Sequence, residues 1–145
     1  MDRKERRIRI ACILALNVFV FLICVFFCHP HFETNDDYSM YGIVSGITGT
    51  RSSHTVFINI LIGRFLSFLF SINRAINWYV WLQFICILIS AIISSLLLES
   101  LRKNVGIILS VCLNAFFYFD AYVNMQFTKT GGVLAVTGAL FCLWT

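Results

Sequence analysis

Residues 75–98 have the sequence AINWYVWLQFICILISAIISSLLL, and this stretch decides the fold. It is 24 residues long and carries no charge, so as a helix it can cross the roughly 30 Å hydrocarbon core of a bilayer. Trp78, Tyr79 and Trp81 at its start are typical of the aromatic belt at a membrane interface. In lipid only helices and closed barrels satisfy the backbone, and a run this long is a helix rather than a barrel strand.

Three further apolar stretches predict membrane-spanning helices, at residues 10–28, 104–119 and 130–145. The predicted fold class is therefore all-α: a polytopic transmembrane helical protein whose outer loop carries short interfacial helices. In this interpretation residues 1–145 form a single membrane-embedded domain. We expect this domain to be the N-terminal portion of a longer chain.

Composition and charge narrow the class of protein. Hydrophobic residues make up 59% and charged residues 12% of the chain, whereas a soluble domain is about a quarter charged. This excludes a soluble enzyme domain, a disordered chain and a disulfide-stapled secreted module. Five of the 11 Lys and Arg residues lie within residues 1–9, which indicates a cytoplasmic N-terminus rather than a nucleic-acid surface. We expect a multi-pass protein of the cell membrane that contacts the lipid bilayer and no nucleic acid.

Residues 56–72 are apolar but carry a polar stripe. Small or polar residues recur at every fourth position: Asn59, Gly63, Ser67 and Ser71. Such a helix can lie along the outer membrane surface, with Asn59, Gly63 and Ser67 facing polar surroundings. Alternatively it spans the membrane and holds Arg64 near mid-bilayer, at a cost of about 2.5–3.5 kcal/mol. Basic residues divide seven inside to four outside in the interfacial topology, and seven inside to three outside in the spanning one, so charge counting does not decide between the two. Arg64 and the stripe favour the interfacial arrangement.

The polar residues 29–55 hold the main candidates for chemistry, because they include the acids Glu33, Asp36 and Asp37. A carboxylate just outside a membrane can act as a general base, hold a divalent cation or bind a sugar hydroxyl. Asn35 and Asp36 also match a helix N-cap, which predicts a short helix over residues 38–47. The alternative is therefore that Asp36 and Asp37 only cap and solvate this helix.

Metal and phosphate binding are weaker predictions in the same loop. His29, His31 and Glu33 alternate, so an extended backbone would place all three side chains on one side, where they could ligate zinc or a hard cation. Histidines next to the end of a membrane-spanning helix more often lie among lipid headgroups than bind a metal. The metal is thus unknown, and a divalent cation is the one candidate cofactor.

Arg51 and His54 lie in a Thr- and Ser-rich segment with donors suited to phosphate, although a solvated loop has the same composition. Arg64 is a third phosphate candidate, and ordinary snorkelling to lipid headgroups is its alternative role. Asp120 lies at the mouth of the third predicted span, on the same outer side as Asp36 in the interfacial topology. It is a candidate second acid or simply an acid at the interface.

The order of these features resembles bacterial polytopic glycosyltransferases of the GT-C class. A basic N-terminus and one span precede the segments that carry the resemblance: Asn35-Asp36-Asp37-Tyr38, Ser45-Gly46, Phe57-Ile58-Asn59, Leu61-Ile62-Gly63, Ile76-Asn77-Trp78-Tyr79 and Gln126-Phe127-Thr128. The similarity runs from about residue 10 to the last residue. GT-C proteins have many more spans, which is why we expect the rest of a longer chain.

The resemblance implies transfer of a sugar from a polyprenyl-phosphate carrier to an acceptor at the extracytoplasmic face of the bacterial cytoplasmic membrane. The essential acid falls on Asp36 or Asp37, and the second acid of some members falls on Asp120. Arg51, Arg64 or a bound metal would meet the departing phosphate. Two alternatives remain open: a non-enzymatic multispan subunit or transporter fragment, and an inactive protein on the GT-C scaffold.

Overall fold

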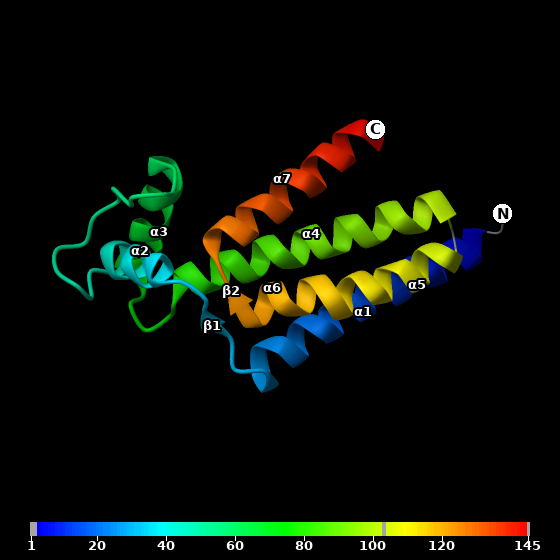
Figure 1. Cartoon of the computed structure of the whole chain (residues 1–145), viewed down its shortest axis with the longest axis horizontal. Coiled ribbons are helices and arrows are strands. Elements are labelled where there is room, and N and C mark those ends of the chain that lie inside the picture. Colours follow the sequence, from blue (N-terminus) through cyan, green and yellow to red (C-terminus); the bar gives the residue numbers. More distant parts are fainter. Residues whose placement is uncertain (1–2, 103, 145) are drawn as a thin grey trace. The chain divides into compact units, whose positions relative to one another are not determined.

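The computed structural model describes residues 3–102 and 104–144, and it confirms the all-α prediction (Figure 1). The helices are α1 (Arg3–Phe27), α2 (Asn35–Ser45), α3 (Ile60–Ile72), α4 (Trp78–Arg102), α5 (Asn104–Leu113), the π-helical turn η1 (Asn114–Tyr118), α6 (Phe119–Val123) and α7 (Phe127–Trp144). Because α5, η1 and α6 follow one another without a break, they form one continuous helix. Two strands of two residues each, β1 (His31–Phe32) and β2 (Asn124–Met125), complete the described elements.

Within the described residues, four helices are long and apolar enough to cross a membrane: Arg3–Phe27, Trp78–Leu101, Asn104–Val123 and Phe127–Trp144. They lie at the four stretches for which the sequence predicts spans. The first begins at Arg3 rather than at residue 10, because the Lys, Arg and Glu residues of the basic start are themselves good helix formers. The predicted features at Met1, Asp2, Lys103 and Thr145 lie outside the described residues.

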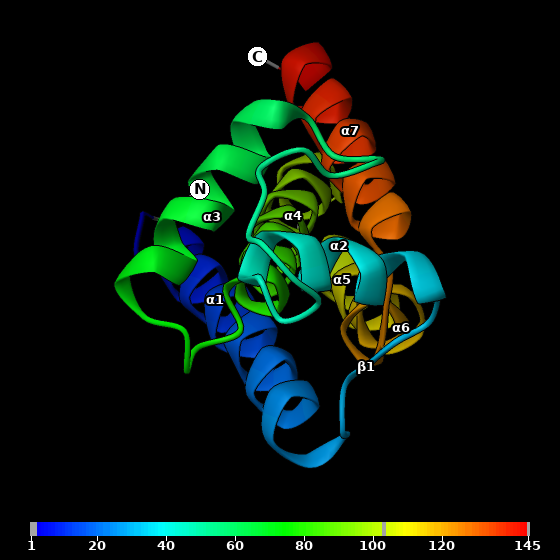
Figure 2. The same cartoon turned by 90° about the vertical axis from the view of Figure 1, so that its left-hand side faces the viewer.

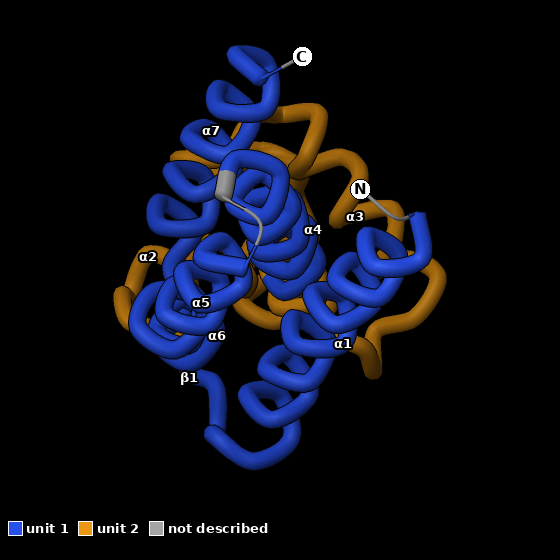
Figure 3. The backbone as a smooth tube through the Cα atoms, turned by 90° about the vertical axis from the view of Figure 1, so that its right-hand side faces the viewer, with its two compact units in different colours: residues 1–31, 84–145 blue, residues 32–83 orange. Residues whose placement is uncertain are grey.

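The chain divides into two compact units (Figure 3). Unit 1 comprises Met1–His31 and Phe84–Thr145, and therefore holds α1, most of α4, the continuous helix from α5 to α6, and α7. Unit 2 is Phe32–Gln83, with α2, α3 and the first turn and a half of α4. The candidate acids Asp36 and Asp37 belong to unit 2, and Asp120 belongs to unit 1.

In unit 1, α1 packs against α5 and α6, and polar side chains join the helices in the interior. The Asn17 side chain donates its amide hydrogens to the carbonyl of Ile13 at 2.8 Å and to Ser95 Oγ at 3.2 Å. The hydroxyls of Ser94 and Tyr118 share a hydrogen bond of 2.7 Å. Such contacts hold helices together where lipid provides no hydrophobic drive for their association. His31, with which the first segment of unit 1 ends, belongs to β1, which pairs with β2.

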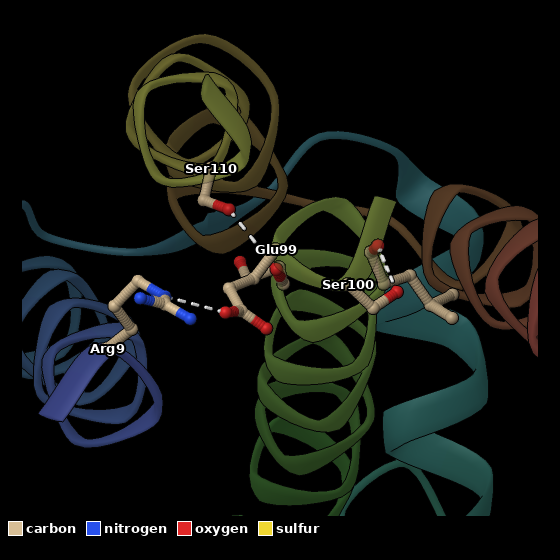
Figure 4. Close-up of polar contacts among 6 residues, drawn as sticks. Arg9, Glu99, Ser100 and Ser110 are labelled. Carbon is tan, nitrogen blue, oxygen red and sulfur yellow. Dashed lines mark hydrogen bonds and ion pairs between the residues drawn. The ribbon is translucent and has the colours of Figure 1, made fainter. Parts of the chain in front are cut away.

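An ion pair links α1 to α4 in unit 1 (Figure 4). Arg9 Nε donates to Glu99 Oε1 at 2.8 Å, and the two side chains are only 14% and 6% exposed. The helix α5 reaches the same level of α4 at Gly106, where an added Cβ would lie 2.2 Å from the Leu98 carbonyl oxygen. Only glycine allows this approach, so the backbones of α4 and α5 meet directly beside Glu99.

In unit 2, α2 begins earlier than the sequence predicts. It covers Asn35–Ser45 rather than residues 38–47, and Thr34 with an extended backbone occupies the N-cap. The prediction that Asn35 and Asp36 form the N-cap is therefore wrong, because both already lie in the first turn. The helix ends at Gly46, whose φ of 78° lies in the left-handed region and whose N–H donates to the Gly42 carbonyl.

The segment between α2 and α3, which can be followed in Figure 2, contacts α3 at Gly63 and at the Ser67 carbonyl. Gly63 is buried and leaves room for the Ser53 carbonyl, which an added Cβ would approach to 2.1 Å. Asn59 is exposed and caps α3, its Oδ1 accepting from the Leu61 N–H at 2.9 Å, so the helix begins at Ile60 and not at residue 56. The stripe thus faces the chain's own loop at Gly63.

Replacing Gly106 by Ala should lower the stability of unit 1, because the new methyl group collides with α4 backbone. Overpacking of this kind costs about 1–3 kcal/mol. Gly138→Ala is the matched control, since an added Cβ at Gly138 has no neighbour within 4 Å and helical alanine gains roughly 0.5–1 kcal/mol over glycine. Thermal melting of both variants in detergent measures the difference. Equal melting temperatures would contradict the close contact.

Removing one member of the Arg9–Glu99 pair should destabilise the protein more than removing both. Glu99→Leu leaves Arg9 without this carboxylate in a buried place, which costs about 3–5 kcal/mol, whereas replacing both charges by apolar groups is often neutral. Unfolding of Glu99→Leu and of the double variant Arg9→Leu/Glu99→Leu, titrated with a denaturing detergent, provides the comparison. A double variant as unstable as Glu99→Leu would argue against the pair.

Candidate functional site

The carboxylate of Asp37 is the centre of unit 2. It is fully buried, and three side chains donate to it. Its Oδ1 accepts from Tyr79 OH at 2.7 Å and from Gln83 Nε2 at 3.2 Å, and its Oδ2 accepts from Thr34 Oγ1 at 2.9 Å. Hydrogen bonds to a charged group are the strong ones, so these contacts fix the first turn of α2 against the start of α4.

The two donors on α4 are placed by helix geometry. Tyr79 and Gln83 are four residues apart, so they lie on one face of the helix and reach the same oxygen. The start of α4 is itself fixed: Trp78 Nε1 donates to the Asn73 carbonyl at 2.8 Å, and Asn77 Oδ1 accepts from the Val80 N–H at 3.2 Å.

An aromatic cluster surrounds the Asp37 contacts. The Phe32 ring packs edge-to-face on Tyr38 at 4.9 Å and on Tyr79 at 5.7 Å between ring centroids. Tyr41 packs between Phe32 and Phe70 of α3, at 6.3 Å and 6.0 Å. These rings keep water from Asp37, which strengthens its hydrogen bonds. Asp37 therefore has the surroundings of a positioning group rather than of one that meets a substrate.

Asp36 is the exposed member of the acid pair. It lies in the first turn of α2, where the positive end of the helix dipole favours a negative charge. One residue along a helix rotates the side chain by about 100°, so the burial of Asp37 leaves Asp36 facing outward. The structure thus distinguishes two acids that the sequence does not. Asp37 is buried and hydrogen-bonded within unit 2, whereas Asp36 is exposed and accessible to a partner.

The candidate phosphate ligands Arg51, His54 and Arg64 all belong to unit 2, and they differ in their contacts. Arg51 is half-buried and its Nη1 donates to the Ser67 carbonyl of α3 at 3.2 Å, so it helps hold the loop on that helix. His54 and Arg64 have exposed side chains. Of the three candidates, only the His54 ring and the Arg64 guanidinium are therefore exposed and accessible to a phosphate.

Asp120, the candidate second acid, closes the turn between α6 and α7 in unit 1. Its Oδ2 accepts from Lys129 Nζ at 2.7 Å, and its Oδ1 accepts from Asn124 Nδ2 at 2.7 Å. Lys129 Nζ also donates to the Asn124 carbonyl at 3.0 Å. With its side chain 48% exposed, Asp120 combines this structural role with access from outside.

The metal site considered for His29, His31 and Glu33 is not assembled. Among residues 3–102 and 104–144, no group of three or more His, Cys, Asp or Glu residues could hold a metal ion. The prediction assumed an extended backbone, but His29 has a φ of 50°, in the left-handed region, which breaks the alternation before β1. The donor set therefore does not fit a metal.

Sequence reasoning missed the residues that hold Asp37. The sequence pattern assigns Tyr79 to the aromatic belt and gives Gln83 and Thr34 no role. A usable signal was present, because Tyr79 and Gln83 place two polar side chains one turn apart in an otherwise apolar span. In such a span a polar pair on one face indicates a polar partner.

Compared with known proteins, the chain matches no family model, no curated protein and no solved structure.

The Asp37 contacts predict different effects for the two acids. Asp37→Asn should speed the amide hydrogen exchange of α2, because the variant loses the charge that Tyr79, Gln83 and Thr34 stabilise. Loss of charged hydrogen bonds costs about 1.5–3 kcal/mol, which corresponds to at least tenfold faster exchange. Asp36→Asn removes the same charge from an exposed side chain and should leave α2 protected. Exchange followed by mass spectrometry in detergent distinguishes them, and equal rates would refute the assignment.

Proposed function

We propose that this chain is part of a membrane glycosyltransferase of the GT-C class, which transfers a sugar from a polyprenyl-phosphate carrier to an acceptor at the extracytoplasmic face. The observation that carries the proposal is the exposed carboxylate of Asp36 beside the buried, three-donor carboxylate of Asp37. The resemblance of Asn35-Asp36-Asp37-Tyr38 and the four helices able to cross a membrane support it. The basic start of the chain supports a cytoplasmic N-terminus in a bacterial cytoplasmic membrane.

In the proposed reaction Asp36 is the general base. Its carboxylate takes the proton of the acceptor hydroxyl while that oxygen attacks the anomeric carbon of the sugar. The bond from the anomeric carbon to the phosphate oxygen breaks, and the polyprenyl phosphate leaves with the bonding electrons. Asp37 does not touch the substrate in this scheme. It positions Asp36 by tying the first turn of α2 to Tyr79 and Gln83.

The departing phosphate needs positive charge nearby. Arg64 presents an exposed guanidinium in unit 2, whereas Arg51 already donates to the Ser67 carbonyl. An Arg can bind a phosphate through two parallel hydrogen bonds, which suits a charge that develops as the bond breaks. Since the described residues provide no metal-ligand cluster, no step is assigned to a divalent cation.

Asp36→Asn in the full-length protein tests the proposal. A positioned base contributes about 10²–10⁴-fold, so transfer from a polyprenyl-phosphate sugar should fall at least 100-fold. Because Asp36 is exposed, the amount of folded protein in the membrane should not change. Glu5→Gln is the control, since it removes one exposed acid of α1, outside the outer loop. Transfer near the wild-type rate in Asp36→Asn would leave the acid pair with a structural role only.

A further inference from the structure

A cluster of polar side chains lies in the interior of unit 1, and it joins α1, α4 and the continuous helix that follows α4. Asn17 Nδ2 donates to Ser95 Oγ at 3.2 Å, and Ser110 Oγ donates to the Ser95 carbonyl at 3.4 Å. Asn114 Nδ2 donates to the Ser110 carbonyl at 2.9 Å. Each of these residues is at most 1% exposed. We call the four residues the interior polar cluster: Asn17, Ser95, Ser110 and Asn114.

Two oxygens of the interior polar cluster have no donor. Asn17 Oδ1 and Asn114 Oδ1 are buried, and no described residue donates a hydrogen bond to either of them. The carboxamide groups cannot turn over to correct this, because each Nδ2 faces a backbone carbonyl: that of Ile13 for Asn17 and that of Ser110 for Asn114. A carbonyl only accepts hydrogen bonds, so it keeps the amide nitrogen on its side. Buried polar atoms nearly always have a partner, which indicates that a bound molecule supplies the missing donors.

The backbone is irregular at the same place. The π-helical turn η1 begins at Asn114, and the Phe119 N–H donates to the Asn114 carbonyl, five residues earlier. A turn of this kind is rare, and within α-helices it occurs frequently at functional sites. The π-helical backbone and an unpaired side-chain oxygen therefore coincide at Asn114. This coincidence is an independent indication of a ligand beside η1.

The surroundings of the cluster favour a neutral ligand. Asn and Ser side chains carry no charge, and Glu99, one helical turn from Ser95, is already paired with Arg9 at 2.8 Å. An ion that enters an apolar interior loses its hydration, and only a nearby opposite charge can offset that loss. A water molecule is neutral and has two hydrogens to donate, one for each unpaired oxygen. A buried water typically binds about two to four polar groups, and the cluster provides that number.

We propose that the interior polar cluster binds a water molecule, which donates one hydrogen to Asn17 Oδ1 and the other to Asn114 Oδ1. The bound water links α1 to η1 and satisfies both oxygens without bringing a charge into the interior. Two further buried hydroxyls of unit 1, Ser90 Oγ and Tyr122 OH, also lack a partner among the described residues. Unpaired polar atoms are thus concentrated in the unit that binds the water. This inference does not depend on the proposed transferase activity.

Nuclear magnetic resonance tests the bound water directly. The full chain is labelled with ¹⁵N-asparagine and placed in lipid nanodiscs, and magnetisation transfer from water to the side-chain amide protons is measured. Asn17 and Asn114 should both show a transfer peak from a long-lived water. Asn114→Leu removes one of the two acceptors and should abolish the peak at Asn17. Asn104→Leu, the same substitution at an exposed position of α5, is the control and should leave it unchanged. No peak in the wild type, or an unchanged Asn17 peak in Asn114→Leu, would overturn the proposal.

The stability of paired variants tests the bridge by a second route. Asn17→Leu and Asn114→Leu each remove the same water, so their effects on the unfolding equilibrium constant should not multiply. The product of the two single effects should exceed the effect of the double variant by at least about twofold. Asn17→Leu combined with Asn104→Leu is the control pair, and its effects should multiply. Unfolding in detergent provides the constants, and effects that multiply for Asn17 and Asn114 would contradict a shared water.

The salt dependence of unfolding distinguishes water from a sodium ion. A ligand that binds only the folded state stabilises it more as its concentration rises. Because the ligand is water, NaCl and choline chloride at equal concentrations should give the same melting temperature throughout a titration. A melting temperature that rises with NaCl and not with choline chloride, and that loses this rise in Asn114→Leu, would identify a sodium site and overturn the proposal.

Discussion

One buried carboxylate organises unit 2 of this chain. Asp37 cannot be placed in an apolar interior unless donors surround it, and Tyr79, Gln83 and Thr34 are those donors. Because two of them lie on α4, the polar segment that follows α1 is fastened to the start of a helix able to cross a membrane. The exposure of Asp36 follows from the burial of its neighbour, and the proposed chemistry follows from that exposure.

Polar and charged side chains in the apolar interior of unit 1 are likewise paired with partners. The buried Glu99 pairs with the half-buried Arg9, and Asn17 and Ser95 form a hydrogen bond across helices. In lipid, packing and polar contacts replace the hydrophobic drive that holds soluble helices together. The direct backbone contact at Gly106 also stabilises the packing of these helices, because it increases van der Waals contact between α4 and α5.

The sequence predicts the helices well and the contacts poorly, for physical reasons. Charge-free runs identify the four long apolar helices, because length and hydropathy are local properties. The identity of the buried acid is not local: Asp36 and Asp37 have the same chemistry, and only the arrival of Tyr79 and Gln83 from α4 distinguishes them. The stripe on α3 likewise predicts a polar partner, although the sequence does not reveal that the partner is the chain's own loop.

A double-mutant cycle on Asp37 and Tyr79 tests the central claim most directly. The free energy of opening of α2, measured by hydrogen exchange, is compared for the wild type, Asp37→Asn, Tyr79→Phe and the double variant. A direct hydrogen bond to a buried carboxylate predicts that the two single effects are not additive, with a coupling of about 1.5–3 kcal/mol. Effects that add to within about 0.5 kcal/mol would mean that Asp37 and Tyr79 do not interact, and would contradict the account.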